Sequence, residues 1–372
     1  MFVRLYNFST NINDYSHNGL GSFDTIQKSE VVEVLNDEYT LSMSILKTDR
    51  LAGKVLPNMC IKAKPNPFDA PQIFVITRVN FKNASTVDIE ANHIKNLYFN
   101  NVIYGDKIDT GYAYTGTPEA IMTQIEQDSA LPNVFNFTSD IVTSGSIRSG
   151  TESKTYGDLF TTEGGMRDVF RGDLKFDNFN VSFLAHRGSE DAKRVLRTGV
   201  NISQFSRETN NFTEYTHVLP YADVPTVESE EDIQAVRLYG AMTRASTSNF
   251  FRVYPKDFTN RFTKKSGYVD PQSQSPHYQE QIDLLTQYGQ QYVTSRPSIK
   301  TPSINITVKI EPSNSGLEDV ALGDKVKVID ERTNYAAEHR IIKAAYDPVM
   351  ERYNSLELSS RKYSLYNYLK GR

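Results

Sequence analysis

The densest set of side chains that could bind a ligand is a run of basic and aromatic residues between positions 244 and 265, with Asp257 as its only acid. Single-strand nucleic-acid-binding proteins use such a mixture, because rings stack on bases while cations pair with phosphates. The alternative is an edge or interface segment whose rings are buried and whose cations face solvent or a partner. No nucleic-acid motif surrounds the run, which favours the alternative. The run consists of Arg244, Arg252, Lys256, Arg261, Lys264 and Lys265, interleaved with Phe250, Phe251, Tyr254, Phe258 and Phe262.

Two short patterns resemble pieces of a metal site. His277 and Glu280 would share one helical face, and Glu338 is followed directly by His339. A metal ion needs three or four converging ligands, and no third ligand is recognisable, so these residues are expected to be surface polar groups. The single cysteine, Cys60, lies in an apolar run and is expected to be buried rather than reactive. No cofactor is predicted.

Carboxylates and glycines gather between positions 163 and 188 without matching a catalytic motif. Asp173 and Asp177 are expected to bind backbone amides in turns, since a catalytic carboxylate pair is defined by its separation in space. The glycines fit no phosphate loop and are predicted to be turn residues. These glycines are Gly164, Gly165, Gly172 and Gly188.

The elements that hold these residues can be predicted from periodicity. Residues 166–170 carry apolar side chains at helical spacing, and Phe179, Val181 and Phe183 alternate with polar neighbours as in a half-buried strand. Arg187-Gly188 is predicted to form a turn, and residues 194–202 another strand. Thr117 followed by Pro118 predicts the start of a helix.

The rest of the chain is predicted to be rich in strands, apart from one helix near residues 279–293. Alternation of apolar and polar residues is clearest from 304 to 310, and Asn36-Asp37 supplies turn chemistry between two strands. Strands are predicted around 39–45, 72–79, 87–91, 304–310, 322–330, 339–347 and 356–360.

The composition bounds the class of protein. The chain has 372 residues, is 38% hydrophobic with 22 tyrosines and 20 phenylalanines, and has a net charge of −4. This charge argues against general nucleic-acid binding through a basic surface. The N-terminus turns polar within a few residues, and no apolar run approaches membrane-spanning length, so a soluble protein made in a cytoplasm is expected.

We predict an α+β fold that is mostly β. It would combine two β-barrel-like domains, an α/β domain and a small helical domain. The predicted domains are 1–105 (first barrel), 106–190 (α/β), 191–235 with 300–362 (second barrel), and 236–299 with 363–372 (helical or irregular tip).

The stretch 164–202 resembles the tail-hub family of long-tailed phages and prophages, which is also labelled prophage tail endopeptidase or tail-associated lysin. The segments 31–45 and 322–328 resemble further parts of that family. The fold is then expected to be similar to the baseplate hub of contractile phages. The residues that carry the resemblance are Gly164, Gly165, Gly172, Asp173, Asp177, Asn178, Arg187, Gly188, Gly199 and Asn201.

The resemblance implies a structural protein of the virion, located at the distal tail tip. A homotrimer would cap the tail tube below the distal tail protein and open at the host surface to release tape-measure protein and DNA. Receptor-binding proteins would attach nearby. Within such a hub, Arg252, Lys256, Arg261, Lys264 and Lys265 would contact the DNA channel or a partner.

Two alternatives belong to other functional classes. In longer relatives a cell-wall-cleaving domain follows the hub, whereas this chain ends at Arg372, so we expect no enzyme activity. The enzymatic alternative is a peptidoglycan-degrading endopeptidase hidden within the hub. The binding alternative is an adhesin for host saccharide, which the many tyrosines suggest, although protein interfaces are enriched in tyrosine as well.

Overall fold

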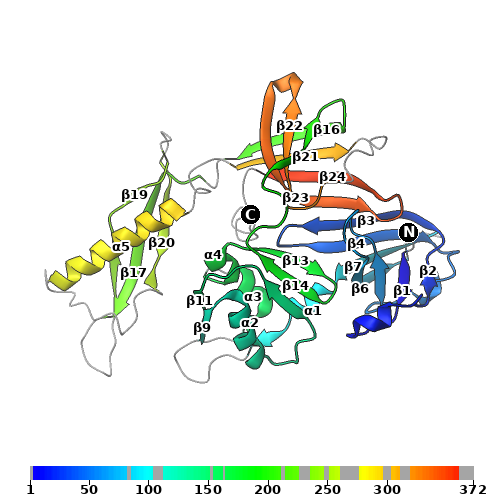
Figure 1. The fold of residues 1–372 in the computed structure, drawn as a ribbon, viewed down its shortest axis with the longest axis horizontal. Helices are drawn as coiled ribbons and strands as arrows, with labels where there is room; N and C mark the ends of the chain where they lie inside the picture. Colours follow the sequence, from blue (N-terminus) through cyan, green and yellow to red (C-terminus); the bar gives the residue numbers. More distant parts are fainter. Residues whose placement is uncertain are drawn as a thin grey trace. The chain divides into compact units, whose positions relative to one another are not determined.

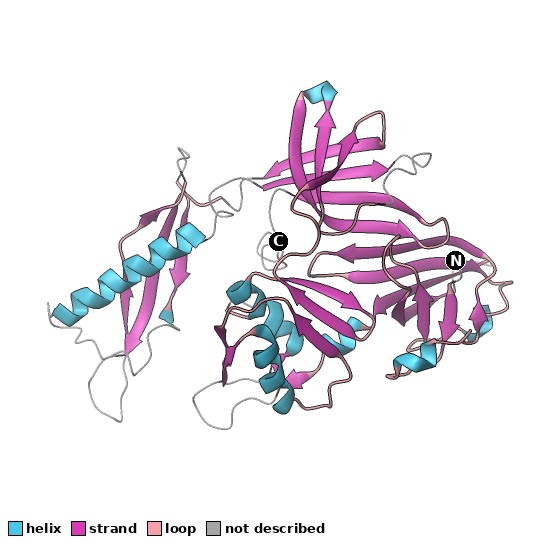
Figure 2. Cartoon of the chain, in the orientation of Figure 1, coloured by secondary structure: helices cyan, strands magenta, loops and turns pink. Residues whose placement is uncertain are grey.

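The computed structural model describes residues 3–81, 85–103, 112–150, 154–161, 164–210, 214–225, 235–246, 251–259, 276–295, 303–310 and 319–359. The chain forms two compact units. The larger unit contains Met1–Arg207 and Ile306–Arg372, and the smaller unit contains Glu208–Asn305. Strands dominate the described residues, which confirms the predicted mostly-β class (Figure 2).

One 13-stranded sheet runs through the larger unit (Figure 1). Its main path is β16-β21-β24-β23-β3-β4-β7-β6-β5-β1-β2, with β22 paired to β23 and β15 paired to β22. The strands are β1 (Arg4–Tyr6), β2 (Gly21–Ser22), β3 (Ile26–Val34), β4 (Tyr39–Leu46), β5 (Cys60–Ala63), β6 (Gln72–Asn80), β7 (Thr86–His93), β15 (Ala192–Arg197), β16 (Ile202–Asn210), β21 (Ser303–Ile310), β22 (Lys325–Asp330), β23 (Tyr335–Asp347) and β24 (Arg352–Ser359).

The sheet joins the regions that we predicted as two barrels. β23 pairs antiparallel with β3, from Lys343 opposite Val34 to Tyr346 opposite Val31. Two sequence segments more than 300 residues apart therefore share one hydrogen-bonded ladder. The first and second barrels are thus parts of one continuous sheet rather than separately closed sheets.

Side-chain alternation explains why these segments form strands. In β4, Tyr39, Leu41, Met43 and Ile45 are buried, and the residues between them are more exposed. This period of two places every second side chain in the core. The strands predicted by the same pattern near 87–91 and 304–310 are confirmed as β7 and β21, and the strand predicted from a nearly continuous apolar run at 72–79 is confirmed as β6.

A mixed α/β layer packs beside β3–β7 and shares their hydrophobic core. Its strands form three small sheets with the orders β10-β14-β13, β11-β9 and β12-β8. Its elements are α1 (Lys95–Phe99), β8 (Val102–Ile103), β9 (Tyr112–Gly116), α2 (Pro118–Gln127), β10 (Asn136–Ser139), β11 (Gly145–Gly150), β12 (Lys154–Thr155), α3 (Tyr156–Thr161), α4 (Met166–Phe170), β13 (Asp173–Asp177) and β14 (Asn180–Leu184). Short 3-10 helices lie at Ile12–Tyr15, Ala52–Lys54 and Glu331–Thr333.

The predicted helix start at Thr117 is confirmed. α2 begins at Pro118, and the Thr117 side chain accepts a hydrogen bond from the backbone N of Ala120. This bond satisfies one of the amides that a helix N-terminus leaves unpaired, and proline at the first position has no amide to satisfy. Ile121 and Ile125 are fully buried, so the apolar face packs into the core.

The described residues of the smaller unit form a sheet that α5 crosses (Figure 1). Its core contains Ala222, Val224, Leu238, Phe258 and Leu285. The central strand β17 pairs with the other three strands. The elements are β17 (His217–Pro225), β18 (Ala235–Tyr239), β19 (Thr243–Arg244), β20 (Val253–Asp257) and α5 (Pro276–Ser295).

Two boundaries differ from the predicted ones. Residues 191–235 were assigned to the second barrel, whereas β17 pairs with β18, β19 and β20 in the smaller unit, which begins at Glu208. The strand predicted over 194–202 is divided by a turn, because β15 ends at Arg197 and β16 begins at Ile202. The helix predicted near 279–293 is confirmed as α5.

Candidate functional site

Asp173 is the centre of a buried polar junction. It opens β13 and is only 1% exposed. One carboxylate oxygen accepts a hydrogen bond from the Asn36 side-chain amide at 3.0 Å. The other accepts bonds from the backbone N of Arg187 at 3.0 Å and from the Arg340 guanidinium at 2.6 Å. Three separate parts of the chain therefore meet at one carboxylate.

Arg340 reaches this junction from β23. Its Nε donates to the carbonyl oxygen of Gly323 at 2.9 Å, and the Nη2 that binds Asp173 also donates to the carbonyl oxygen of Arg187 at 2.5 Å. A guanidinium presents several donors in a fixed plane, which suits it to hold two loops and a carboxylate at once. The ion pair is buried, with both side chains less than a tenth exposed.

Arg187 extends the junction to β3. Its Nη1 donates to Glu33 at 2.7 Å and to the carbonyl oxygen of Leu174 at 3.4 Å. The backbone N of Leu174 in turn donates to the side-chain oxygen of Asn36 at 2.5 Å. The Asn36 turn, the β13 strand and the Arg187 turn are thus bound to one another through side chains.

Charge pairing sets the ionisation of these groups. Burial by itself would raise the pKa of Asp173, but the hydrogen bonds and charge of Arg340, with the Asn36 bond, hold that pKa below its usual range. Burial would lower the pKa of Arg187, and the Glu33 carboxylate raises it instead. Both groups are therefore ionised at neutral pH and serve as fixed structural charges.

Two glycines allow the turns at the junction to touch. Gly188 and Gly323 have φ of +90° and +94°, a backbone region that favours glycine. A Cβ on Gly188 would lie 2.4 Å from the backbone N of Asp324. The backbone N of Ser189 donates to Asp324 at 2.7 Å, and the backbone N of Lys325 donates to Ser189 O at 3.1 Å. The turn predicted at Arg187-Gly188 thus docks directly on the turn before β22.

Asn178 forms a second contact in the hairpin between β13 and β14. It has φ of +53°, its side-chain oxygen accepts from the backbone N of Ile73 at 2.9 Å, and its own backbone N donates to Gln72 at 2.7 Å. Gln72 also donates to Asp177 at 2.9 Å and pairs with His93. The hairpin therefore binds the start of β6.

The other residues that carry the resemblance lie in turns. Gly164 and Gly199 have φ of +77° and +79°, with open space where a Cβ would project. Gly165 precedes α4, and Gly172 precedes β13, with Phe183 too close for a Cβ. Asn201 accepts a hydrogen bond at 2.7 Å from the backbone N of the residue four positions earlier. The structure brings five of the predicted residues to the Asp173 junction and the Asn178 hairpin: Asp173, Arg187, Gly188, Asp177 and Asn178.

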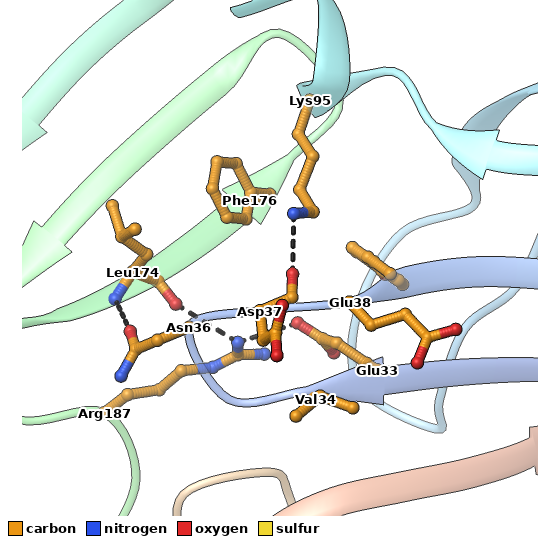
Figure 3. Close-up of a pocket in the computed structure, with 10 residues that line it drawn as sticks. Glu33, Val34, Asn36, Asp37, Glu38, Lys95, Leu174, Phe176 and Arg187 are labelled. Atoms are coloured by element: carbon orange, nitrogen blue, oxygen red, sulfur yellow. Dashed lines mark hydrogen bonds and ion pairs between the residues drawn. The ribbon is translucent and has the colours of Figure 1, made fainter. Parts of the chain in front are cut away.

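A small recess lies beside the junction, and its side chains fill it so that no water-sized molecule fits. Lys95 is 5% exposed there, and its ammonium donates to the carbonyl oxygen of Asp37 at 2.6 Å (Figure 3). It lies over the rings of Phe99 and Phe176 at 4.9 and 5.1 Å. Burial lowers its pKa to about 8. The recess is lined by Glu33, Val34, Asn36, Asp37, Glu38, Tyr39, Lys95, Leu174, Phe176 and Arg187.

The aromatic-basic run is only partly described. Lys256 lies over Phe258 and Tyr292 at 5.7 and 5.5 Å, and Tyr254 stacks on Tyr292, so this side of β20 packs against α5. Arg252 is half-buried, and its backbone pairs with Thr216. The rings of Tyr254 and Phe258 therefore pack against α5. Phe250, Arg261, Phe262, Lys264 and Lys265 lie outside the described residues.

Of the two patterns that resembled metal sites, the first includes His277, whose side chain lies outside the described residues. Within the described ranges, no group of three His, Cys, Asp or Glu side chains is placed to hold a metal ion. His339 is buried in β23, where its ring bonds to the Tyr335 hydroxyl, and burial lowers its pKa. Among the same residues, no helix combines the length and apolarity needed to cross a membrane.

Sequence reasoning missed Arg340 and Glu33, the partners of Asp173 and Arg187. Both lie inside strands, where their pairing depends on residues more than 150 positions away. One signal was available for Arg340. It stands next to the apolar run 341–342 in a strand, and a charged residue in such a position is rarely buried without a partner.

Comparisons with known proteins identify the architecture. Residues 190–369 match the family model described as prophage endopeptidase tail. Over the whole chain, the fold is similar to prophage tail protein gp18 from Listeria monocytogenes EGD-e, with a TM-score of 0.58 and 14% identity, covering 100% of this chain and 98% of that one. No curated protein matches the sequence.

Two further solved structures have the same fold. The tail protein from Neisseria meningitidis MC58 gives a TM-score of 0.56 at 10% identity, with 96% of each chain covered. The 43 kDa tail protein of prophage MuSo2 from Shewanella oneidensis gives a TM-score of 0.52 at 11% identity, covering 90% of this chain and 93% of that one. Residues 190–369 therefore match the prophage endopeptidase tail family, and the whole length of the chain has the fold of prophage tail proteins.

Proposed function

We propose that this protein is a structural hub of a phage or prophage tail. Three copies would cap the distal end of the tail tube below the distal tail protein, and the closed trimer would open to let tape-measure protein and DNA pass. The observation that carries the proposal is the fold, which matches solved prophage tail proteins over essentially the full chain. The family match over residues 190–369 supports it independently.

The buried junction fits a mechanical role. Its ion pairs and turn contacts tie β3, β13 and β23 together, so that force on one part of the larger unit is passed to the others. Hydrogen-bonded polar networks in a low-dielectric interior favour one arrangement of the elements that they join, and in this one Nε and Nη2 of Arg340 are both bonded. A hub under load during ejection needs this resistance to internal shear.

The same contacts argue against an endopeptidase. Asp173 is 1% exposed and its two oxygens accept three hydrogen bonds from the protein itself, while Asp177 accepts a bond from Gln72. A catalytic carboxylate must reach substrate or water. We therefore propose that the chain is not an enzyme, in spite of the name of the family model that residues 190–369 match.

The position in the tail is tested by labelling. The chain would be expressed with a C-terminal peptide tag from its own prophage, and induced particles would be imaged by electron microscopy with a gold-labelled antibody. We expect gold at the distal tip only. Gold along the tube, at the head-proximal end or absent from tails would contradict the hub. Purified chain should also fail to clear a suspension of host cell walls, and clearing that an Asp or Glu substitution abolishes would establish the enzyme.

A further inference from the structure

The smaller unit has two unlike surfaces. α5 covers one face of its sheet, where Val218, Ala222 and Val224 of β17 are buried. The opposite face, here called the open face, carries His217, Tyr221 and Asp223 of β17, Arg237 and Tyr239 of β18, and Phe251, whose ring stacks on His217. Phe251 is 83% exposed and Tyr239 is 52% exposed. Large rings at this exposure on one face mark an interaction surface.

The side chains of the open face are held in place before any partner binds. The rings of His217 and Phe251 are 5.2 Å apart and nearly parallel, and those of Tyr221 and Tyr239 are 6.2 Å apart. Arg237 lies 4.9 Å above the Tyr221 ring, and Asp223 holds it through two bonds of 2.7 and 2.8 Å. Side chains fixed in this way lose little conformational entropy on binding.

The charges decide which class of partner fits. Strand register places Arg244 beside His217 and Asp257 beside Tyr221, so the described residues of the open face include two arginines and two aspartates. Lys256 lies on the other side of the sheet, over the rings that pack on α5. A nucleic-acid surface needs an excess of cations, which this balance does not provide.

The composition favours a protein rather than a saccharide. Among the described residues of the open face, rings of Tyr and Phe occur together with Arg and without Lys or Glu, as in the core of a protein interface. The exposed face of α5 differs, since it carries Glu280, Asp283 and Gln287. Arg237 covers one face of the Tyr221 ring and Phe251 covers one face of the His217 ring, so these two rings are less open to stacking on a sugar.

We propose that the open face binds a different tail polypeptide, whose apolar patch has an acid opposite Arg244 and a base opposite Asp257. These two charges have no ion pair among the described residues. They lie on opposite sides of β17 and are offset along it by about 13 Å, the rise of four residues in a strand. Two copies of the open face could also pair about a two-fold axis. A cyclic trimer contains no such axis, so the choice of a different polypeptide rests on the proposed function.

Photocrosslinking in the full chain tests this proposal. Phe251→p-benzoylphenylalanine would be expressed together with the tail proteins encoded beside it, with Gln287→p-benzoylphenylalanine on the exposed face of α5 as the matched control. We expect the Phe251 position to crosslink one other tail polypeptide, and the control position not to do so. No crosslink, equal crosslinking at both positions, or a crosslink only to a second copy of this chain would overturn the proposal.

A charge variant gives a second readout. Tyr239→Asp should weaken binding of the crosslinked partner about tenfold or more, as expected for an aromatic anchor, whereas Gln287→Asp should leave binding unchanged. Equal binding by both variants would contradict the open face as the contact. The molar mass of the same preparations is measured by light scattering. A trimer without a Phe251 crosslink rejects only this proposal, and a crosslink without a trimer rejects only the trimeric hub.

Discussion

Arg340 and Asp173 form the ion pair on which the junction depends at the level of single residues. Replacing Arg340 by methionine keeps the apolar bulk but leaves a buried carboxylate without its cation. Breaking one side of a buried pair costs about 3–5 kcal/mol of unfolding free energy. We expect Arg340→Met to lose stability on that scale in urea unfolding.

The matched control is Arg194→Met. Arg194 also pairs with an aspartate, Asp319, at 2.8 Å, but both side chains are about half exposed. Solvent screens such a pair, so its removal should leave the unfolding free energy nearly unchanged. If the two substitutions lower the unfolding free energy equally, burial of the Arg340 pair does not increase its contribution to stability.

Because of Lys95, the unfolding free energy should depend on pH in the alkaline range. Its folded pKa of about 8 lies below the ordinary lysine value, so folding disfavours the charged form. The penalty is present below pH 8 and disappears as pH rises toward 10.5, because there only the unfolded chain still binds the proton. Relative to Lys95→Met, the wild-type chain should gain about 3 kcal/mol over this window. Parallel stability curves for the two chains, measured by urea unfolding at several pH values, would contradict the depressed pKa.

At the scale of elements, the contact between the Gly188 and Gly323 turns leaves no room for a side chain. Gly188→Ala would place its Cβ 2.3 Å from the carbonyl carbon of Gly323, so the backbone must shift. We expect a loss of at least about 3 kcal/mol in unfolding free energy, from overpacking added to backbone strain.

Gly199→Ala isolates the strain from the contact. Gly199 has a similar φ of +79°, but nothing lies within 4 Å of an added Cβ. The Gly199→Ala substitution should lower the unfolding free energy by only about 1–2 kcal/mol, the strain of a left-handed non-glycine residue. If Gly188→Ala costs no more than Gly199→Ala in the same unfolding assay, the two turns are not in close contact.

Local elements were predictable because their signals are local. The alternation of Tyr39 to Ile45, the Thr117-Pro118 helix start and the apolar positions of α5 all act within a few residues. The positive φ of Asn36 and Asn178 likewise follows from turn chemistry. By contrast, which strands pair is decided by contacts across the whole chain.

At the scale of the whole molecule, the pairing of strands and side chains that are distant in the sequence could not be predicted. Nothing near Lys343 indicates that β23 pairs with β3, and nothing near Arg340 indicates Asp173, which lies 167 positions away. For the same reason the limits of the smaller unit at Glu208 and Asn305 were not foreseen. The motif residues themselves were found, but their role in joining three parts of the chain required the structure.

The trimeric hub is the central claim, and the solution mass of the purified full-length chain tests it most directly. Light scattering would be recorded for the chain alone and mixed with the distal tail protein encoded beside it. We predict three times the 42.2 kDa of one chain, either alone or once that partner is added, as closed cyclic symmetry requires. A chain that stays at 42.2 kDa with and without the partner would contradict the hub.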